Sequence, residues 1–145
     1  MKTTMLTMAV VASVAFGLAQ GAADADLEGK WEALSNTATS ITGNIQVTDD
    51  AITFGDGTRL GMSAEGSAKG KWGDQQDPVE GAIYRLEPPA DPALLNGNQF
   101  CGMPDKKATY VVLAPIDDGL SLLVYTGDAK PMPDASSCAI YNYAR

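Results

Sequence analysis

The segment Ala108–Thr126, ATYVVLAPIDDGLSLLVYT, contains the strongest pair of predicted strands in the chain. Its halves, Ala108–Ala114 and Leu120–Thr126, are apolar and rich in the β-branched and aromatic residues that strands favour. The Pro-Ile-Asp-Asp-Gly connection between them suits a hairpin turn, because Asp and Gly are preferred turn residues. The segment therefore predicts an antiparallel hairpin around which the rest of the fold is organised.

The N-terminus has the three parts of a secretory signal peptide. Lys2 supplies the positive charge, an apolar run follows to about Ala19, and small residues suited to a cleavage site come next. The run is too short for a membrane span, and no cysteine is present there to carry a lipid. We expect a signal peptide over residues 1–23 and one exported domain over residues 24–145, periplasmic or extracellular and without a membrane anchor.

The two cysteines of the chain, Cys101 and Cys138, lie on either side of the central hairpin. An exported protein meets an oxidising compartment, and two cysteines allow a single pairing. Neither belongs to a C-x-x-C motif, which disfavours a redox or metal role. We therefore predict a Cys101–Cys138 disulfide.

Further strands are predicted where apolar and polar residues alternate, or where β-branched and aromatic residues gather. These strands are Leu27–Leu34, Ile41–Thr48, Ala51–Phe54, Thr58–Met62, Ala82–Glu87 and Cys138–Arg145. Ser63–Lys71 suits either a loose strand or a loop. About eight short strands predict an all-β domain, most simply an antiparallel up-and-down barrel and alternatively a β-sandwich.

Turn residues divide these strands. Asp56-Gly57 predicts a two-residue type I′ hairpin, and Pro88-Pro89 is expected to end a strand because proline cannot donate to a ladder. Asp91–Gly97, with an acidic N-cap, a proline and a closing glycine, predicts the one helical turn of the chain. Gly73–Gly81 and Gly127–Ser137 are polar and are predicted to be loops.

Gly29-Lys30-Trp31 in the first predicted strand, together with the terminal Arg145, resembles the lipocalin and avidin (calycin-type) superfamily of small β-barrels. The resemblance implies that Trp31 lies across the base of the barrel and that Arg145 packs over it as a structural closure. It does not extend to biotin binding, since two tryptophans fall short of the aromatic set that avidins use. The general design is also similar to that of small exported bacterial inhibitors of lysozyme and of metalloproteases, without a motif that matches.

The composition excludes several classes of catalytic and metal-binding site. With no histidine, the chain lacks Ser-His-Asp and Cys-His catalysis, most zinc sites and His-ligated haem. Asp49-Asp50 and Asp117-Asp118-Gly119 lack the spacing of a calcium loop and are simpler as turns. We expect no enzyme activity, no cofactor and no metal site.

The charge balance restricts the partners. Acidic residues outnumber basic ones 18 to 10, giving a net charge of −8 and an isoelectric point near 4.3. Such a surface repels nucleic acid phosphates and anionic lipids. Its electrostatic complement is a basic exported protein, and the alternative is that the acidic surface serves only solubility.

Binding residues are expected on two long loops, Pro88–Cys101 and Gly127–Cys138, which the disulfide would tie together. The alternative is that the disulfide and the loop prolines only stabilise a small exported domain. Trp72 suits either an exposed interface anchor or a place inside the barrel. The predicted interface residues are Trp72, Pro88, Pro89, Asn96, Pro131 and Pro133. The sequence favours a non-enzymatic exported binding protein, in its concrete form an inhibitor of a basic secreted hydrolase such as lysozyme or a protease. The alternative is a carrier that holds a small apolar ligand inside the barrel.

Overall fold

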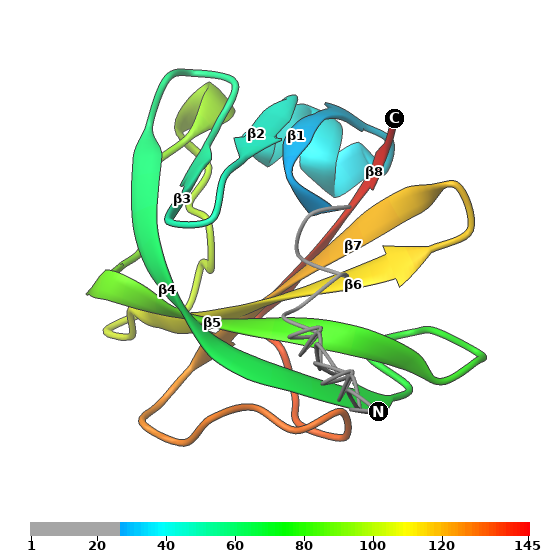
Figure 1. Ribbon diagram of the computed structural model, residues 1–145. Helices are drawn as coiled ribbons and strands as arrows, with labels where there is room; N and C mark the ends of the chain where they lie inside the picture. The colour runs from blue at the N-terminus through cyan, green and yellow to red at the C-terminus, as the bar shows by residue number, and fades with distance from the viewer. Residues whose placement is uncertain (1–26) are drawn as a thin grey trace, which may run out of the picture.

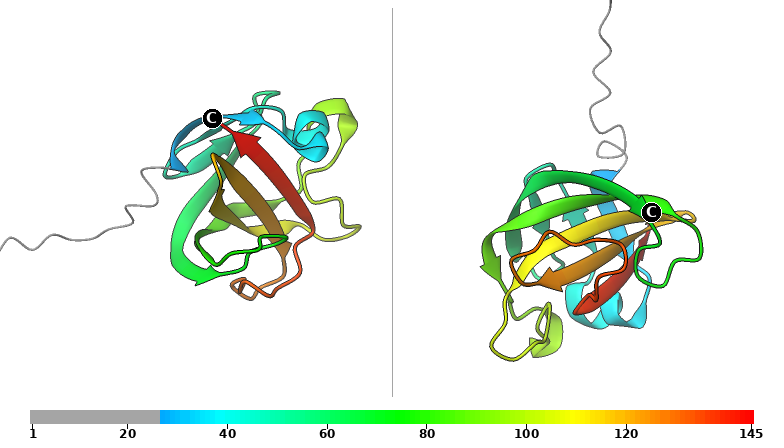
Figure 2. Two further views of the ribbon diagram at one scale, coloured as in Figure 1. Left: turned by 90° about the vertical axis from the view of Figure 1, so that its right-hand side faces the viewer. Right: turned by 90° about the horizontal axis from the view of Figure 1, so that it is seen from below.

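The computed structural model describes residues 27–145 as a closed barrel of eight antiparallel strands (Figures 1 and 2). Each strand pairs with the next one in the chain, and β8 pairs with β1 to close the barrel. The up-and-down barrel is confirmed, and the sandwich alternative is wrong. The predicted signal peptide lies outside the described residues. The strands are β1 (Gly29–Ala33), β2 (Ile45–Val47), β3 (Ala51–Thr53), β4 (Arg59–Gly70), β5 (Val79–Ala90), β6 (Ala108–Ile116), β7 (Gly119–Thr126) and β8 (Ala139–Ala144).

The predicted central hairpin is confirmed as β6 and β7. The two strands pair from Ala108 opposite Thr126 to Ile116 opposite Gly119, so the turn consists of Asp117 and Asp118. Asp118 adopts φ 55°, a left-handed conformation that Asp tolerates better than most residues. Within residues 27–145, no helix is long and apolar enough to cross a membrane.

The strands β4 and β5 are longer than predicted. Each has 12 residues, so the undecided segment Ser63–Lys71 lies almost entirely in β4. β5 does not end at Pro88-Pro89 but runs on to Ala90. The prolines instead interrupt its pairing with β6, because they have no N–H to donate. Figure 1 shows β4 as a long bent strand that passes from one side of the barrel to the other.

The predicted strand over Ile41–Thr48 is mostly wrong. Ala38–Thr42 forms one turn of helix η1, and only Ile45–Val47 is extended. Gly43 causes the difference, because its φ of 63° breaks the extended path while its N–H donates to the Ala38 carbonyl at 2.7 Å. Local alternation of apolar residues could not reveal this turn.

Two predicted turns also differ. At Asp56-Gly57 only Gly57 has positive φ, and the Gly57 N–H donates to the Phe54 carbonyl. This is a three-residue loop closed by a left-handed glycine, not a type I′ turn. The predicted helical turn at Asp91–Gly97 is reduced to η2 (Leu95–Gly97), a short 3-10 segment.

The barrel interior is filled by side chains from all eight strands. Phe100 enters it from the β5–β6 loop, with its ring centroid 5.1 Å from that of Phe54 and 5.7 Å from that of Tyr141. The largest interior side chains that are almost completely buried include Tyr141, Tyr143, Phe100, Ile52, Leu86, Leu113, Leu120 and Leu122. The interior is thus a packed core.

A second apolar cluster covers the outer face of β5, β6 and β7. It contains Trp72, Ile83, Tyr110, Val112, Ala114, Leu123 and Tyr125. Two loops close over it, residues 71–78 and residues 127–138. Gly73 approaches Leu123 and Ile140, and Pro133 packs on Gly70. The orange loop after β7 can be followed across the strands in the right-hand view of Figure 2.

Candidate functional site

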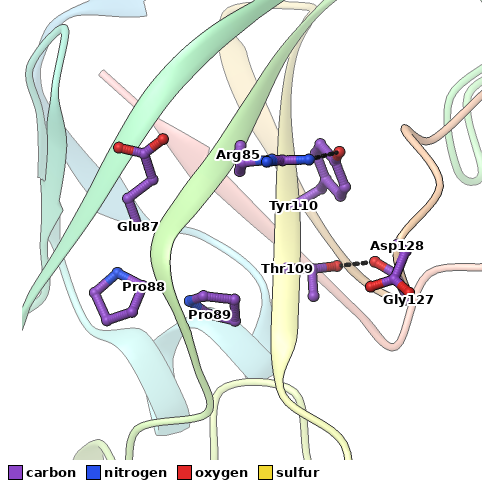
Figure 3. A pocket seen from close by; sticks show the side chains of 8 residues that line it. All are labelled: Arg85, Glu87, Pro88, Pro89, Thr109, Tyr110, Gly127 and Asp128. Carbon is purple, nitrogen blue, oxygen red and sulfur yellow. Dashed lines mark hydrogen bonds between the residues drawn. The ribbon is translucent and has the colours of Figure 1, made fainter.

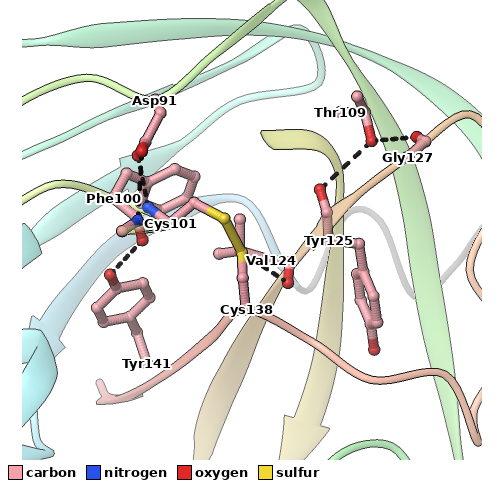
Figure 4. The surroundings of a disulfide bond; sticks show 10 residues. Asp91, Phe100, Cys101, Thr109, Val124, Tyr125, Gly127, Cys138 and Tyr141 are labelled. Carbon is pink, nitrogen blue, oxygen red and sulfur yellow. Dashed lines mark hydrogen bonds between the residues drawn. A yellow bond between two sulfur atoms is a disulfide. The ribbon is translucent and has the colours of Figure 1, made fainter. Parts of the chain in front are cut away.

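The end of the barrel at the β5–β6 loop is closed by the predicted disulfide, which is confirmed (Figure 4). Cys101 and Cys138 are bonded with their Cα atoms 5.4 Å apart. Asp91 accepts hydrogen bonds from the N–H groups of Cys101 at 2.6 Å and Gly102 at 3.2 Å, so it organises this loop rather than a helix. The Tyr141 hydroxyl donates to the Phe100 carbonyl at 2.5 Å. These contacts hold Phe100 as a plug in the barrel.

The opposite end is closed by Trp31 and Arg145. The Arg145 guanidinium carbon lies 4.2 Å from the centroid of the Trp31 ring, and the indole N–H donates to the Leu27 carbonyl at 2.8 Å. Arg145 also donates to the Glu28 carbonyl at 3.2 Å. This is the arrangement that the resemblance to lipocalins and avidins implied. A shallow pocket of about 590 Å³ adjoins these residues and Leu27, the first described residue.

Trp72 has neither of its two expected placements. It lies outside the barrel wall rather than inside, and it is completely buried rather than exposed. Its indole N–H donates to the Ala68 carbonyl at 3.0 Å, and its ring packs so closely on Gly81 that a Cβ there would overlap it. Trp72 is therefore part of the structure and presents no surface to a partner.

The remaining predicted interface residues are scattered. Pro131 is buried and Pro133 is half-buried against Gly70. Asn96 is exposed, and its amide donates to the Ser40 carbonyl at 3.1 Å, which fastens the β5–β6 loop to η1. Pro88 and Pro89 are exposed and lie together in a pocket.

This pocket, of about 360 Å³, lies on the outer face of β5 and β6 (Figure 3). The prolines form one wall, Tyr110 and Thr109 of β6 form the floor, and the start of the loop after β7 forms the far side. Arg85 reaches across its upper part toward Tyr110. The lining residues are Arg85, Glu87, Pro88, Pro89, Thr109, Tyr110, Gly127 and Asp128.

The pocket exists because strand pairing is interrupted on both sides of Thr109. Along the β5–β6 ladder, the register changes from Arg85 opposite Tyr110 to Ala90 opposite Ala108, leaving extra residues on β5. Along the β6–β7 ladder, an extra residue lies on β6 between Ala108 and Tyr110. Such bulges re-aim side chains and frequently accompany functional sites.

Side chains replace some of the missing ladder contacts. The Thr109 hydroxyl donates to the Gly127 carbonyl at 2.6 Å and lies 3.3 Å from the Tyr125 carbonyl oxygen. This fixes the start of the loop after β7 at the rim of the pocket. The pocket therefore has a braced floor and rim.

The Arg85 charge is compensated within the protein. Its guanidinium donates to the Tyr110 hydroxyl at 3.1 Å, lies 5.6 Å from the Tyr110 ring centroid and is 3.6 Å from the Glu65 carboxylate. The hydrogen bond and the electrostatic interaction with Tyr110, followed by the charge of Glu65, raise the pKa of Arg85 above its ordinary value. Arg85 is thus held as part of the wall.

Two carboxylates remain at the pocket rim. Glu87 accepts a hydrogen bond from the Ser63 hydroxyl at 2.9 Å. Asp128 is exposed, and within residues 27–145 no hydrogen bond or ion pair involves its side chain. The pocket thus combines apolar ring walls with negative charge on two sides. Within the same residues, no group of three His, Cys, Asp or Glu side chains could hold a metal ion.

Sequence reasoning found only the prolines of this site. Arg85, Thr109 and Tyr110 read as ordinary strand residues, and Asp128 as an ordinary loop residue. The one available signal was the Pro88-Pro89 pair inside a β-rich segment, since proline in a strand accompanies edges and bulges. The site itself depends on the register of β6 against both neighbours.

In comparisons with family models, curated proteins and solved structures, none matched this chain. The lipocalin and avidin relationship therefore remains a prediction.

Proposed function

We propose that this protein is a non-enzymatic exported binding protein whose outer surface attaches to a basic exported protein. Its concrete form is an inhibitor of a basic secreted hydrolase such as lysozyme or a protease. The observation that carries the proposal is the filled barrel, with Phe100 in one end and Trp31 under Arg145 at the other. A partner would therefore bind to the outer surface of the barrel.

Charge supports a basic partner. The net charge of −8 raises the encounter rate with a positively charged protein and opposes nucleic acid and anionic lipid. The disulfide is consistent with an oxidising compartment. The filled interior weighs against the alternative of a small-ligand carrier, because Phe100, Tyr141 and Tyr143 occupy the space that a ligand would need.

Lysozyme provides the first test. Protein purified from an oxidising compartment is titrated into lysozyme, with binding followed by calorimetry and activity followed on cell walls. We expect binding that weakens strongly as salt shortens the Debye length from about 10 Å at 0.1 M to about 3 Å at 1 M. A pull-down from the native compartment extends the search to other basic proteins. A co-purifying lipid, no salt-dependent partner and no inhibition would contradict the proposal.

A further inference from the structure

The pocket between β5, β6 and the loop after β7 has the shape and charge to receive one side chain of the partner. We propose that it binds a lysine or arginine side chain, with the methylene stem over Pro89 and Thr109 and the cationic head at Asp128. The proposal rests on the function proposed above and names the recognition site on the surface. Figure 3 shows Pro89, Thr109 and Asp128 arranged in that order across the lower part of the pocket.

The pocket is large enough for a single side chain. Its volume of about 360 Å³ lies near the lower end of the range for small-molecule pockets. Long cationic side chains bury their stems on apolar surface while keeping the charged head in water. The exposed proline rings supply most of the apolar surface, and the pocket is open to solvent, which leaves the head hydrated. A proline wall is also rigid, which lowers the ordering cost of binding.

The charges around the pocket select a cation. Among the described residues that line the pocket, Arg85 is the one cationic side chain, and the Glu65 carboxylate at 3.6 Å offsets part of its charge. Glu87 and Asp128 then leave the rim negative, and Asp128 has an acceptor group with no internal competitor among the described residues. A carboxylate and a cationic donor form the stronger, charge-assisted class of hydrogen bond. An anionic ligand would have to approach both carboxylates.

The position of Asp128 is maintained by its neighbours. The Thr109 hydroxyl holds the Gly127 carbonyl, and the Lys130 ammonium donates to the Glu65 carbonyl at 3.1 Å. The chain on both sides of Asp128 is thus anchored to β6 and β4. A preorganised acceptor costs less to order on binding than a mobile one.

The matched control for Asp128 is Asp134. Both are exposed aspartates in the loop of residues 127–138, but Asp134 does not line the pocket. Asp128→Asn and Asp134→Asn therefore remove the same charge from the same loop. Both variants should keep the wild-type melting temperature, so that changes in binding are not changes in folding.

The direct test uses N-acetyl-arginine amide and N-acetyl-lysine amide as probes at millimolar concentrations, with N-acetyl-citrulline amide as the uncharged counterpart of arginine. We expect saturable NMR shifts at the backbone amides of Thr109, Gly127 and Asp128 with the cationic probes, and none with citrulline. Asp128→Asn should weaken probe binding about fivefold, within the range of one exposed charge pair. Asp134→Asn should change it less than about twofold.

Several results would overturn the inference. They are equal losses in the two variants, shifts spread evenly over all acidic residues, or saturable shifts at the pocket with N-acetyl-glutamate amide instead. Lysozyme binding measured in parallel separates the two proposals. If lysozyme binds in a salt-dependent way while the pocket amides do not respond, the proposed function stands and the pocket assignment fails. If the pocket responds but no basic protein binds, the proposed function fails.

Discussion

The inner and outer faces of the sheet formed by β5, β6 and β7 are both buried, but by different means. The inner face is covered by the opposite side of the barrel and by Phe100, whereas the outer face is covered by two loops and Trp72. Strands buried on both faces read as continuous apolar runs, as in Val111–Ala114. The cover on the outer face ends at Arg85 and Thr109, and the pocket lies there. The comparison shows that the pocket lies where the loop cover stops.

The two tryptophans give the largest expected effects. Trp31→Ala in the barrel interior and Trp72→Ala in the outer cluster should each lower the free energy of unfolding by about 3–5 kcal/mol, because each removes a large buried ring. Urea unfolding followed by circular dichroism measures both. A loss below about 1 kcal/mol for Trp72→Ala would mean that the outer cluster is not a second core.

The disulfide should affect the inner face selectively. Cys138→Ser should cost about 2–4 kcal/mol, since the bridge closes a long loop and holds the Phe100 plug. In a Trp31→Phe background, the fluorescence of Trp72 should stay unchanged under native conditions, because Trp72 packs on β5–β7 and the N–H of residue 138 still ties the end of the covering loop to the Val124 carbonyl at 2.8 Å. A red shift of that emission would contradict the separation of the two faces. Reduction of the wild type by dithiothreitol is the control.

The buried tyrosines should respond oppositely to loss of their hydroxyls. In the barrel interior, the Tyr143 hydroxyl lies 2.6 Å from the Thr42 hydroxyl, so Tyr143→Phe should cost about 1 kcal/mol. On the outer face, the Tyr125 hydroxyl is buried and has no hydrogen-bond partner among the described residues. Tyr125→Phe should therefore stabilise the protein by about 1 kcal/mol. Thermal unfolding of both variants measures the two effects. Destabilisation by both substitutions would contradict the expected opposite effects.

Alkaline pH should destabilise the protein gradually. Burial raises the pKa of Tyr125 from its ordinary value of 10.0 to about 12, and burial also raises the pKa of Tyr141 and of Tyr143. A raised folded pKa means that the unfolded chain loses the proton first, so stability is complete below pH 10 and falls as the pH rises toward 12. Urea unfolding across this range measures the slope. The free energy of unfolding of Tyr125→Phe should fall less steeply with pH than that of the wild type. An unchanged slope would contradict the contribution of Tyr125.

The correct and incorrect predictions divide by the distance over which the determining contacts act. The β6–β7 hairpin and the eight-strand barrel follow from local composition and alternation, and both are confirmed. The strand predicted over Ile41–Thr48 failed because Gly43 turns the chain there, and the Thr42 hydroxyl pairs with Tyr143 from the last strand. Of the residues that line the pocket, the sequence predicted only Pro88 and Pro89 as binding residues, because the others come from separate strands and a distant loop.

The sequence by itself determined the all-β class, the single cysteine pairing and the negative charge. Each of these depends on composition or on neighbouring residues, whose preferences act before the chain is closed. Tertiary structure alone decided that Trp72 lies outside the wall and that Asp128 faces Pro89 across Thr109. These placements depend on the strand register and on the path of the loops over the barrel. Closure of the barrel fixes the register of all strands together.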